Sequence, residues 1–194
     1  MKNVLLIGNS GGIGSALQAA WHVRGYEVMG LSRQTDGLDI TDEGAIERIL
    51  RTIKTRFDIV FIATGGLETE NGLPEKSLSD LSKRAFQEQF LLNAIGPALV
   101  LKHVPKLLHK DRPTIVATLS ARVGSIGDNR LGGWYSYRAS KAALNQIIHS
   151  AAIELSRMRP KSICIALHPG TVRTALTQKY VGKHPAVSTT EAAN

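Results

Sequence analysis

The sequence predicts an α/β protein in which a parallel sheet is covered by helices on both of its faces. Short apolar runs alternate with longer stretches of helical periodicity. The runs are apolar at every position, which is typical of strands buried on both faces. Glycines follow several of them closely, where the chain turns toward the next helix. These observations favour a doubly wound, Rossmann-type sheet in a single domain that spans residues 1–194.

The first half of the chain carries three predicted strands and two predicted helices. Gly25 ends the first helix, and Thr41-Asp42-Glu43 caps the second. In chain order the elements are the strand Val4–Ile7, the helix Ser15–Arg24, the strand Glu27–Leu31, the helix from Thr41 to about Lys54, and the strand Asp58–Ala63.

The second half continues the alternation. A loop over residues 67–79, with Asn71-Gly72 and Pro74, precedes a helical pattern over 80–108 that Gly96-Pro97 and Pro105 interrupt. The later elements are the strand Thr114–Leu119, an irregular stretch over 124–133, the helix Tyr137–Arg157 and the strand Ser162–Leu167. A further helix start is predicted at Ser188. The chain then ends at Asn194, which leaves open whether the fold lacks its last helix and strand.

Composition excludes several classes of protein. The chain is 43% hydrophobic and 21% charged, which indicates a globular rather than a disordered protein. Its single cysteine, Cys164, excludes a disulfide framework, and its histidines lack metal-ligand spacing. The N-terminal apolar run is too short for a signal peptide or a membrane helix, so we expect a cytoplasmic protein with no membrane partner.

The net charge of +8 indicates an anionic partner. The basic residues are scattered and no nucleic-acid motif is present, so we expect no nucleic acid. The charge by itself does not identify the anionic partner.

The glycine-rich segment after the first strand has the pattern of a nucleotide-binding turn. It reads Gly8-Asn9-Ser10-Gly11-Gly12-Ile13-Gly14. Glycines allow a tight turn and a close approach of the backbone, and the helix that follows offers free N–H groups to a pyrophosphate. The alternative is a turn with no ligand, since glycine motifs alone give many false positives. The strand–turn–helix context favours nucleotide binding.

The end of the second strand indicates which nucleotide is bound. An acidic residue there binds the ribose of NAD, whereas an arginine accommodates the 2′-phosphate of NADP. This chain has Ser32-Arg33 and no acid before Asp36. The pair therefore favours NADP(H) over NAD(H). The alternative is that Arg33 is a solvated surface residue.

Tyr137 and Lys141 lie four residues apart and therefore on one face of a predicted helix. A free tyrosine has a pKa of ~10, and a nearby ammonium lowers that value toward the range of acid–base catalysis. Such a pair is common on helices, so it is weak evidence by itself.

The order of these features resembles the classical short-chain dehydrogenase/reductase family over nearly the whole chain. The features are Gly8/Gly12/Gly14, Asn93, Ser120, Tyr137/Lys141 and Pro169-Gly170. The stretch from Ser120 to Asn145 is most similar to the C-factor and sniffer-like carbonyl reductases. The resemblance implies hydride transfer between a nicotinamide and a small carbonyl or alcohol substrate, in a homodimer or homotetramer.

The resemblance also implies roles for individual residues. Tyr137 would exchange a proton with the substrate oxygen, and Lys141 would bind the nicotinamide ribose and lower the pKa of Tyr137. A serine would bond the substrate oxygen, and Asn93 would hold a water. The implied cofactor contacts are Gly8, Ser10, Gly11, Gly12, Ile13, Gly14, Ser32, Arg33, Asp39, Ile40, Ala63, Thr64, Gly65, Tyr137, Lys141, Pro169, Gly170, Val172 and Thr174.

The sequence itself supports an unusual backbone at Asn93. Pro97 has no N–H, so the carbonyl of Asn93 loses its helical partner and is free to bond water. A kink that only follows the sheet is the alternative, and it is compatible with this role.

Two positions depart from the family pattern. Ile62-Ala63-Thr64-Gly65 replaces the usual Asn-Asn-Ala-Gly, which puts the local support of the sheet in doubt. The family's catalytic serine falls at Ala121, so we favour Ser120 and keep Ser125 as the alternative. The displaced serine also keeps open a second function, a cofactor-binding regulatory or signalling protein with little turnover.

Overall fold

The computed structural model describes residues 1–68, 72–181 and 185–194. Its centre is a five-stranded sheet in the order β2-β1-β3-β4-β5, with every neighbouring pair parallel. The predicted strands are confirmed to within a residue or so at their ends. They are β1 (Asn3–Ile7), β2 (Glu27–Leu31), β3 (Ile59–Ile62), β4 (Thr114–Leu119) and β5 (Ser162–Leu167).

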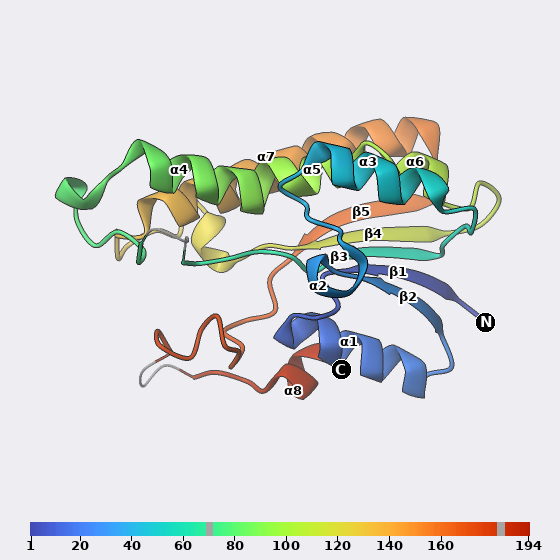
Figure 1. Cartoon of the computed structure of the whole chain (residues 1–194), viewed down its shortest axis with the longest axis horizontal. Coiled ribbons are helices and arrows are strands. Elements are labelled where there is room, and N and C mark those ends of the chain that lie inside the picture. Colours follow the sequence, from blue (N-terminus) through green and yellow to red (C-terminus); the bar gives the residue numbers. More distant parts are fainter. Residues whose placement is uncertain (69–71, 182–184) are drawn as a thin grey trace.

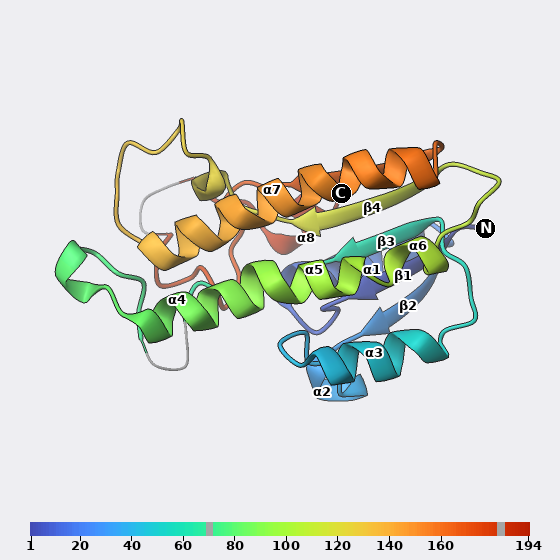
Figure 2. The same ribbon diagram turned by 90° about the horizontal axis from the view of Figure 1, so that it is seen from above.

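Helices cover both faces of the sheet, as predicted, but unequally (Figure 1). One face carries α3 (Glu43–Thr52), α4 (Lys83–Phe90), α5 (Gly96–Leu101), α6 (Val104–Leu107) and α7 (Tyr135–Met158). In Figure 2, α4, α5 and α6 form one row, with α7 on one side of it and α3 on the other. The other face carries α1 (Gly12–Val23) and α8 (Thr189–Ala193), and the short α2 (Arg33–Asp36) follows β2. None of the helices in the described ranges is long and apolar enough to span a membrane.

The core lies on both faces of the central strands because successive residues of a strand point to opposite sides. Leu5 and Ile7 of β1 pack toward the large helical layer, whereas Leu6 packs toward α1. Leu5 and Leu6 are both fully buried. This two-sided burial explains why the central strands read as continuous apolar runs.

β5 departs from this pattern. Ile163, Ile165 and Leu167 are exposed, and Ile163 retains 56% of its accessible surface. The apolar run at 162–167 predicts burial on both faces, but in the described residues α8 packs against α1 and leaves this part of the sheet open. Packing, not strand pairing, therefore decides the exposure of β5.

The long helical pattern over 80–108 forms a chain of shorter elements. α4 runs into a π-helical segment, Leu91–Ile95, and then into α5, and α6 follows after a turn. The irregular segment lies directly before Pro97, which lacks the N–H that a regular helix needs. The predicted loop over 67–79 leads into a 3₁₀ turn, Leu78–Asp80, and α4 begins after it at Lys83. Asn71 of that loop lies outside the described residues.

The predicted helix start near the C-terminus is confirmed. The Ser188 side chain accepts a hydrogen bond from Glu191 N, and the Glu191 carboxylate accepts one from Ser188 N. This reciprocal cap begins α8.

Candidate active site

The candidate site lies at the carboxyl ends of the strands, where open parallel sheets bind ligands. Gly8 N donates to Leu31 O at 2.7 Å, Ala63 N donates to Ile7 O at 2.7 Å, and Ser120 N donates to Leu167 O at 2.8 Å. These three bonds extend the strand pairing by one residue. They place the segments after β1, β3 and β4 at one edge of the sheet.

The glycine-rich turn is packed too tightly for side chains at two positions. Gly8 has a φ of +93°, and a Cβ there would stand 2.9 Å from the Thr64 methyl carbon. A Cβ on Gly14 would overlap the Gly8 carbonyl oxygen. The two glycines are therefore needed for the first turn of α1 to pack against the strand end.

The N-terminus of α1 is open to a ligand. Gly11 is the N-cap residue and makes no side-chain cap, and the first turn of α1 contains no acidic residue. Ser10 is exposed and Ile13 is half-buried. The free N–H groups and the helix dipole at this end favour an anion.

The segment after β5 lies against the same turn. A Cβ on Gly12 would stand 3.0 Å from the Thr174 methyl carbon. Val172 is buried, and the Thr177 hydroxyl accepts a hydrogen bond from Thr174 N at 3.0 Å. Thr174, predicted from the far end of the chain, thus meets the predicted glycine turn. Pro169 and Gly170, where φ is +78°, form the bend between β5 and this segment.

Ser32 and Arg33, the two residues predicted to select the nucleotide, have different roles at the end of β2. The Ser32 hydroxyl accepts a bond from Thr35 N and caps α2, which is a structural role. The Arg33 side chain is 77% exposed, and its guanidinium is 3.9 Å from an Asp39 oxygen. An exposed guanidinium at this edge is free to take a phosphate.

The Asp39 carboxylate forms hydrogen bonds within its own turn. It accepts hydrogen bonds from Thr41 N at 2.8 Å and from the Thr41 hydroxyl at 2.6 Å. Burial raises the pKa of Asp39, but the Thr41 bonds and the Arg33 charge outweigh burial and hold it below its ordinary value. The neighbouring Ile40 is buried beside Gly96 of α5.

Asn93 is fully buried in the π-helical segment, and its side chain holds the loop after β3. Its Oδ1 accepts from Gly66 N at 3.0 Å, and its Nδ2 donates to Gly66 O at 2.9 Å. Gln89 adds a third bond by donating from Nε2 to Leu67 O at 2.8 Å. The sequence predicted the irregular backbone at Asn93 but not this side-chain clamp.

Lys141 lies at the point where these elements converge. It is only 3% exposed, and its Nζ donates to Leu119 O at 3.1 Å. A Cβ on Gly65 would stand 3.2 Å from this Nζ and 3.1 Å from Asn93 Oδ1. Burial lowers the pKa of Lys141 to about 8, because the ammonium is taken out of water.

The pKa of Tyr137 does not move as predicted. Burial raises it to about 12, because the phenolate is disfavoured away from water. The Lys141 Nζ lies 6.0 Å from the Tyr137 ring centroid, so the two residues do share one helix face. Burial sets the direction of this shift. Tyr137 is therefore a neutral phenol at physiological pH.

The two candidate serines have different surroundings. The half-buried Ser120 donates from Oγ to Asn145 Oδ1 at 2.6 Å, and Asn145 lies one turn beyond Lys141 on α7. The exposed Ser125 accepts from Asp128 N at 3.3 Å. Ser120 is thus the serine attached to the Tyr137 helix. Its hydroxyl hydrogen is already donated to Asn145.

Trp134, just before α7, completes this neighbourhood. Its indole is edge-on to the Tyr137 ring, at a centroid distance of 6.3 Å, and edge-on to the Tyr180 ring, at 5.6 Å. Tyr180 comes from the segment after β5, and its hydroxyl donates to Glu68 at 2.7 Å. No local pattern in the sequence indicates Tyr180, because only folding brings it to Trp134.

This geometry can be compared with known proteins. A family model described as enoyl-(acyl carrier protein) reductase matches residues 8–194. The chain belongs to the short-chain dehydrogenase/reductase family. The resemblance stated from the sequence is thereby confirmed.

Three similar proteins illustrate this family membership. The 1-hydroxy-2-glutathionyl-2-methyl-3-butene dehydrogenase of Rhodococcus sp. (strain AD45) is 29% identical over 209 residues, which is 100% of this chain and 88% of that protein. The C-signal of Myxococcus xanthus is 36% identical over 99 residues, which is 50% of this chain and 58% of that protein. A short-chain dehydrogenase/reductase from Burkholderia multivorans with bound NADP aligns with a TM-score of 0.80 at 26% identity, over 99% of this chain and 87% of that chain.

The residues present fit the nicotinamide dinucleotide that this reductase family uses. The N-terminus of α1 has no side-chain cap. Gly8 and Gly14 carry no side chains that would crowd this turn. Lys141 Nζ makes one hydrogen bond within the described residues, which leaves two N–H groups for ribose hydroxyls. A bound nicotinamide would supply or accept the hydride.

The departure of this chain from the family pattern at residues 62–65 has a structural replacement. Thr64 packs its methyl group beside Gly8, and the Asn93 and Gln89 side chains hold the loop that follows. The loop is therefore supported without the asparagines that the family usually carries there.

Proposed function

We propose that the chain is an NADP(H)-dependent reductase or dehydrogenase of small carbonyl or alcohol compounds, with Tyr137 as its acid–base group. The observation that carries the proposal is the position of Lys141. Its buried ammonium lies beside Gly65 and Asn93 at the carboxyl edge, one helical turn from Tyr137. A buried cation at this edge of the sheet can bind ribose hydroxyls and stabilise a phenolate.

The proton chemistry suits reduction. Tyr137 is a neutral phenol, so it holds the proton that the substrate oxygen needs when a hydride reaches the carbonyl carbon. The phenolate left behind is then stabilised by the Lys141 ammonium on the same helix face. To bond the substrate carbonyl oxygen, the Ser120 hydroxyl would turn away from Asn145 Oδ1 and donate its hydrogen to the substrate.

The preference for NADP(H) rests on Arg33. Its exposed guanidinium follows β2, whereas the Asp39 carboxylate is occupied by Thr41. The relative from Burkholderia multivorans with bound NADP is consistent with this preference. NAD(H) is the less favoured cofactor.

The direct test is Tyr137→Phe, which removes the proton donor and keeps the ring. We expect NADPH-dependent reduction of activated aldehydes and ketones to fall by at least ~100-fold, the scale of general acid catalysis, while NADPH still binds. Tyr135→Phe is the matched control, because Tyr135 lies on the same helix two residues earlier. Full activity in the Tyr137 variant would refute the proposed role.

The serine geometry favours a second candidate function. Ala121 has no hydroxyl, and the Ser120 hydroxyl is engaged by Asn145. A regulatory or signalling protein that binds the cofactor but turns over little substrate would have such a site. Tight NADPH binding with no turnover across a broad panel of aldehydes, ketones and quinones would support this second function.

We further propose a homodimer or homotetramer. Ala139 and Ala143 are small, half-buried residues of α7, and Ser150 is a small exposed one, so a second helix could approach closely. Sedimentation equilibrium would measure the mass of the particle, and a monomer at micromolar concentration would contradict the proposal.

A further inference from the structure

Trp134 has an unusual backbone conformation at a critical position. Among the residues that the structure describes, it is the one non-glycine residue with a positive φ, at +52°. It follows Gly132 and Gly133, which have φ values of +64° and +63°. A bulky side chain is strained in this region, and such strain persists only where the surroundings hold it.

Glu75, from the loop before α4, holds Trp134 in place. The Glu75 carbonyl oxygen accepts from Trp134 N at 2.5 Å, and the Glu75 carboxylate accepts from Ser136 N at 3.3 Å. Glu75 is only 3% exposed and makes no ion pair with the described residues. Trp134 itself gives α7 no side-chain cap, so the Glu75 carboxylate serves as the cap from 61 residues away.

The held conformation places the indole between two aromatic rings. Trp134 is edge-on to Tyr137 at 70° and edge-on to Tyr180 at 79°. Tyr180 is held in turn by Glu68, which also pairs with Lys179 at 3.2 Å. Two separate segments of the chain, each anchored by a glutamate, thus build one aromatic surface beside Tyr137. We call Trp134 and Tyr180 the aromatic wall.

We propose that the aromatic wall selects substrates in which a planar apolar group, such as an aryl ring, is attached to the reacting carbonyl. This inference rests on the proposed function, because it assumes that the substrate oxygen binds at the Tyr137 hydroxyl. Because the Trp134 indole lies edge-on to the Tyr137 ring at 6.3 Å, an aryl group attached to the reacting carbonyl would lie near it. Aromatic rings gain from edge-to-face contact at centroid distances of ~4.5–7 Å. A methyl group in place of the aryl ring gains far less.

The strain at Trp134 makes a clean experiment possible. Trp134→Gly removes the indole and puts at this position the residue that a positive φ suits best, so the backbone of the first turn of α7 is retained. Trp134→Phe keeps an aromatic ring. Two α-keto esters serve as matched probes: ethyl benzoylformate carries a phenyl group where ethyl pyruvate carries a methyl group.

We expect Trp134→Gly to lower kcat/KM for ethyl benzoylformate by about tenfold, the scale of an aromatic pair, with most of the loss in KM. The value for ethyl pyruvate should fall by a clearly smaller factor, so that the ratio of the two kcat/KM values shifts toward ethyl pyruvate. The Kd for NADPH should change by less than about threefold. Trp134→Phe should retain most of the preference for the aryl ester. These results together would support the aromatic wall.

Other outcomes would overturn the inference. An equal loss with both esters, mainly in kcat, would mean that Trp134 only positions Tyr137, and the proposed function would stand. No loss with either ester would mean that the wall does not meet the substrate. A wild-type protein that reduces neither ester nor any other carbonyl compound would overturn this inference and the proposed function together.

Discussion

Replacing the buried Lys141 by methionine should make the ligand-free protein more stable while abolishing its proposed chemistry. Lys141 is 3% exposed, and burial lowers its pKa from 10.5 to about 8. Burying the charged ammonium therefore lowers the free energy of unfolding. Methionine is similar in length, apolar and flexible, so it fits a buried site without a charge.

The magnitude follows from the pKa. A fall from 10.5 to about 8 corresponds to roughly 3–4 kcal/mol at pH 7, because each unit of pKa shift is worth ~1.36 kcal/mol. Methionine also loses the hydrogen bond to Leu119 O, a loss of ~1–2 kcal/mol. The net gain is about 2 kcal/mol, which is a rise of ~4–8 °C in Tm for a domain of this size.

The sign of the effect depends on pH. Between pH 8 and 10.5 the unfolded chain keeps a proton on this lysine that the folded chain has lost, so wild-type stability rises with pH across that window. Lys141→Met lacks this rise. Its advantage should be complete below pH 8, shrink above it, and turn into a deficit of ~1–2 kcal/mol above pH 10.5, where only the lost hydrogen bond remains.

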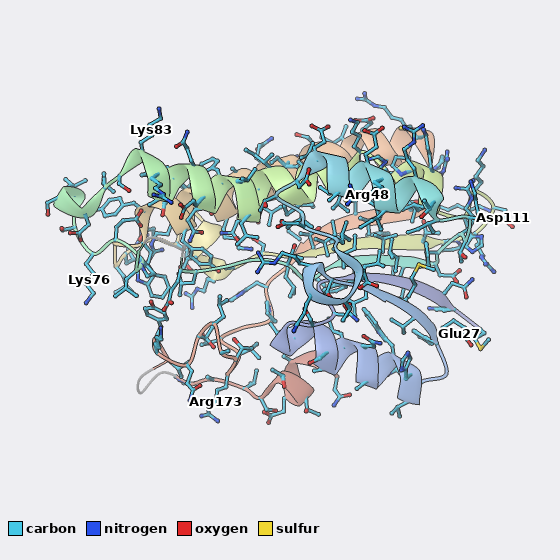
Figure 3. The ribbon with its side chains drawn as sticks, viewed as in Figure 1. Glu27, Arg48, Lys76, Lys83, Asp111 and Arg173 are labelled. Atoms are coloured by element: carbon cyan, nitrogen blue, oxygen red, sulfur yellow. The ribbon has the colours of Figure 1, made fainter. Side chains whose placement is uncertain are left out.

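Urea unfolding at pH 7 and pH 10.5, without cofactor, measures both values. Lys83→Met is the control, because Lys83 is exposed on the outer side of α4 (Figure 3) and should change stability by less than ~0.5 kcal/mol. If Lys141→Met is less stable than the wild type at pH 7, or if its difference from the wild type does not vary with pH, the reasoning is wrong.

Three further predictions follow from the same edge of the sheet. Gly14→Ala places a Cβ against the Gly8 carbonyl, so urea unfolding should show that the free energy of unfolding falls by ~1–3 kcal/mol. Titration should show weakened NADPH binding. Gly127→Ala is the control, because Gly127 has open space around it. Arg33→Ala should raise the Kd for NADPH by about tenfold or more and leave that for NADH nearly unchanged; equal weakening of both would refute the NADP(H) preference. Ser120→Ala should lower kcat by ~10-fold or more and Ser125→Ala by less than about twofold in steady-state assays, and the reverse order would assign the role to Ser125.

Parts of the fold that rest on local patterns were predictable. The apolar runs located all five strands of the described sheet, and the Ser188–Glu191 pattern located the reciprocal cap of α8. Tyr137 and Lys141 could be placed on one face of a helix because helical spacing depends on few other residues. Pro97 likewise predicted an irregular backbone near Asn93.

Features that depend on contacts between distant segments were not predictable. Nothing near Glu75 in the sequence indicates that it caps a helix 61 residues away, or that Tyr180 meets Trp134. The exposure of β5 was missed for the same reason, since a strand pattern does not say which helix covers it. These contacts depend on how helices and loops pack, which no short window of sequence contains.

The sequence by itself determined the α/β architecture, the glycine turn, and the order of Asn93, Ser120, Tyr137 and Lys141 along the chain. These features follow from backbone geometry and periodicity, which act over a few residues. Only the tertiary structure decided the environment of those residues. Burial raises the pKa of Tyr137 and lowers that of Lys141, and the strained Trp134 stands beside the acid–base group. Desolvation and strain arise when distant segments close around a site, so they belong to the fold rather than to any motif.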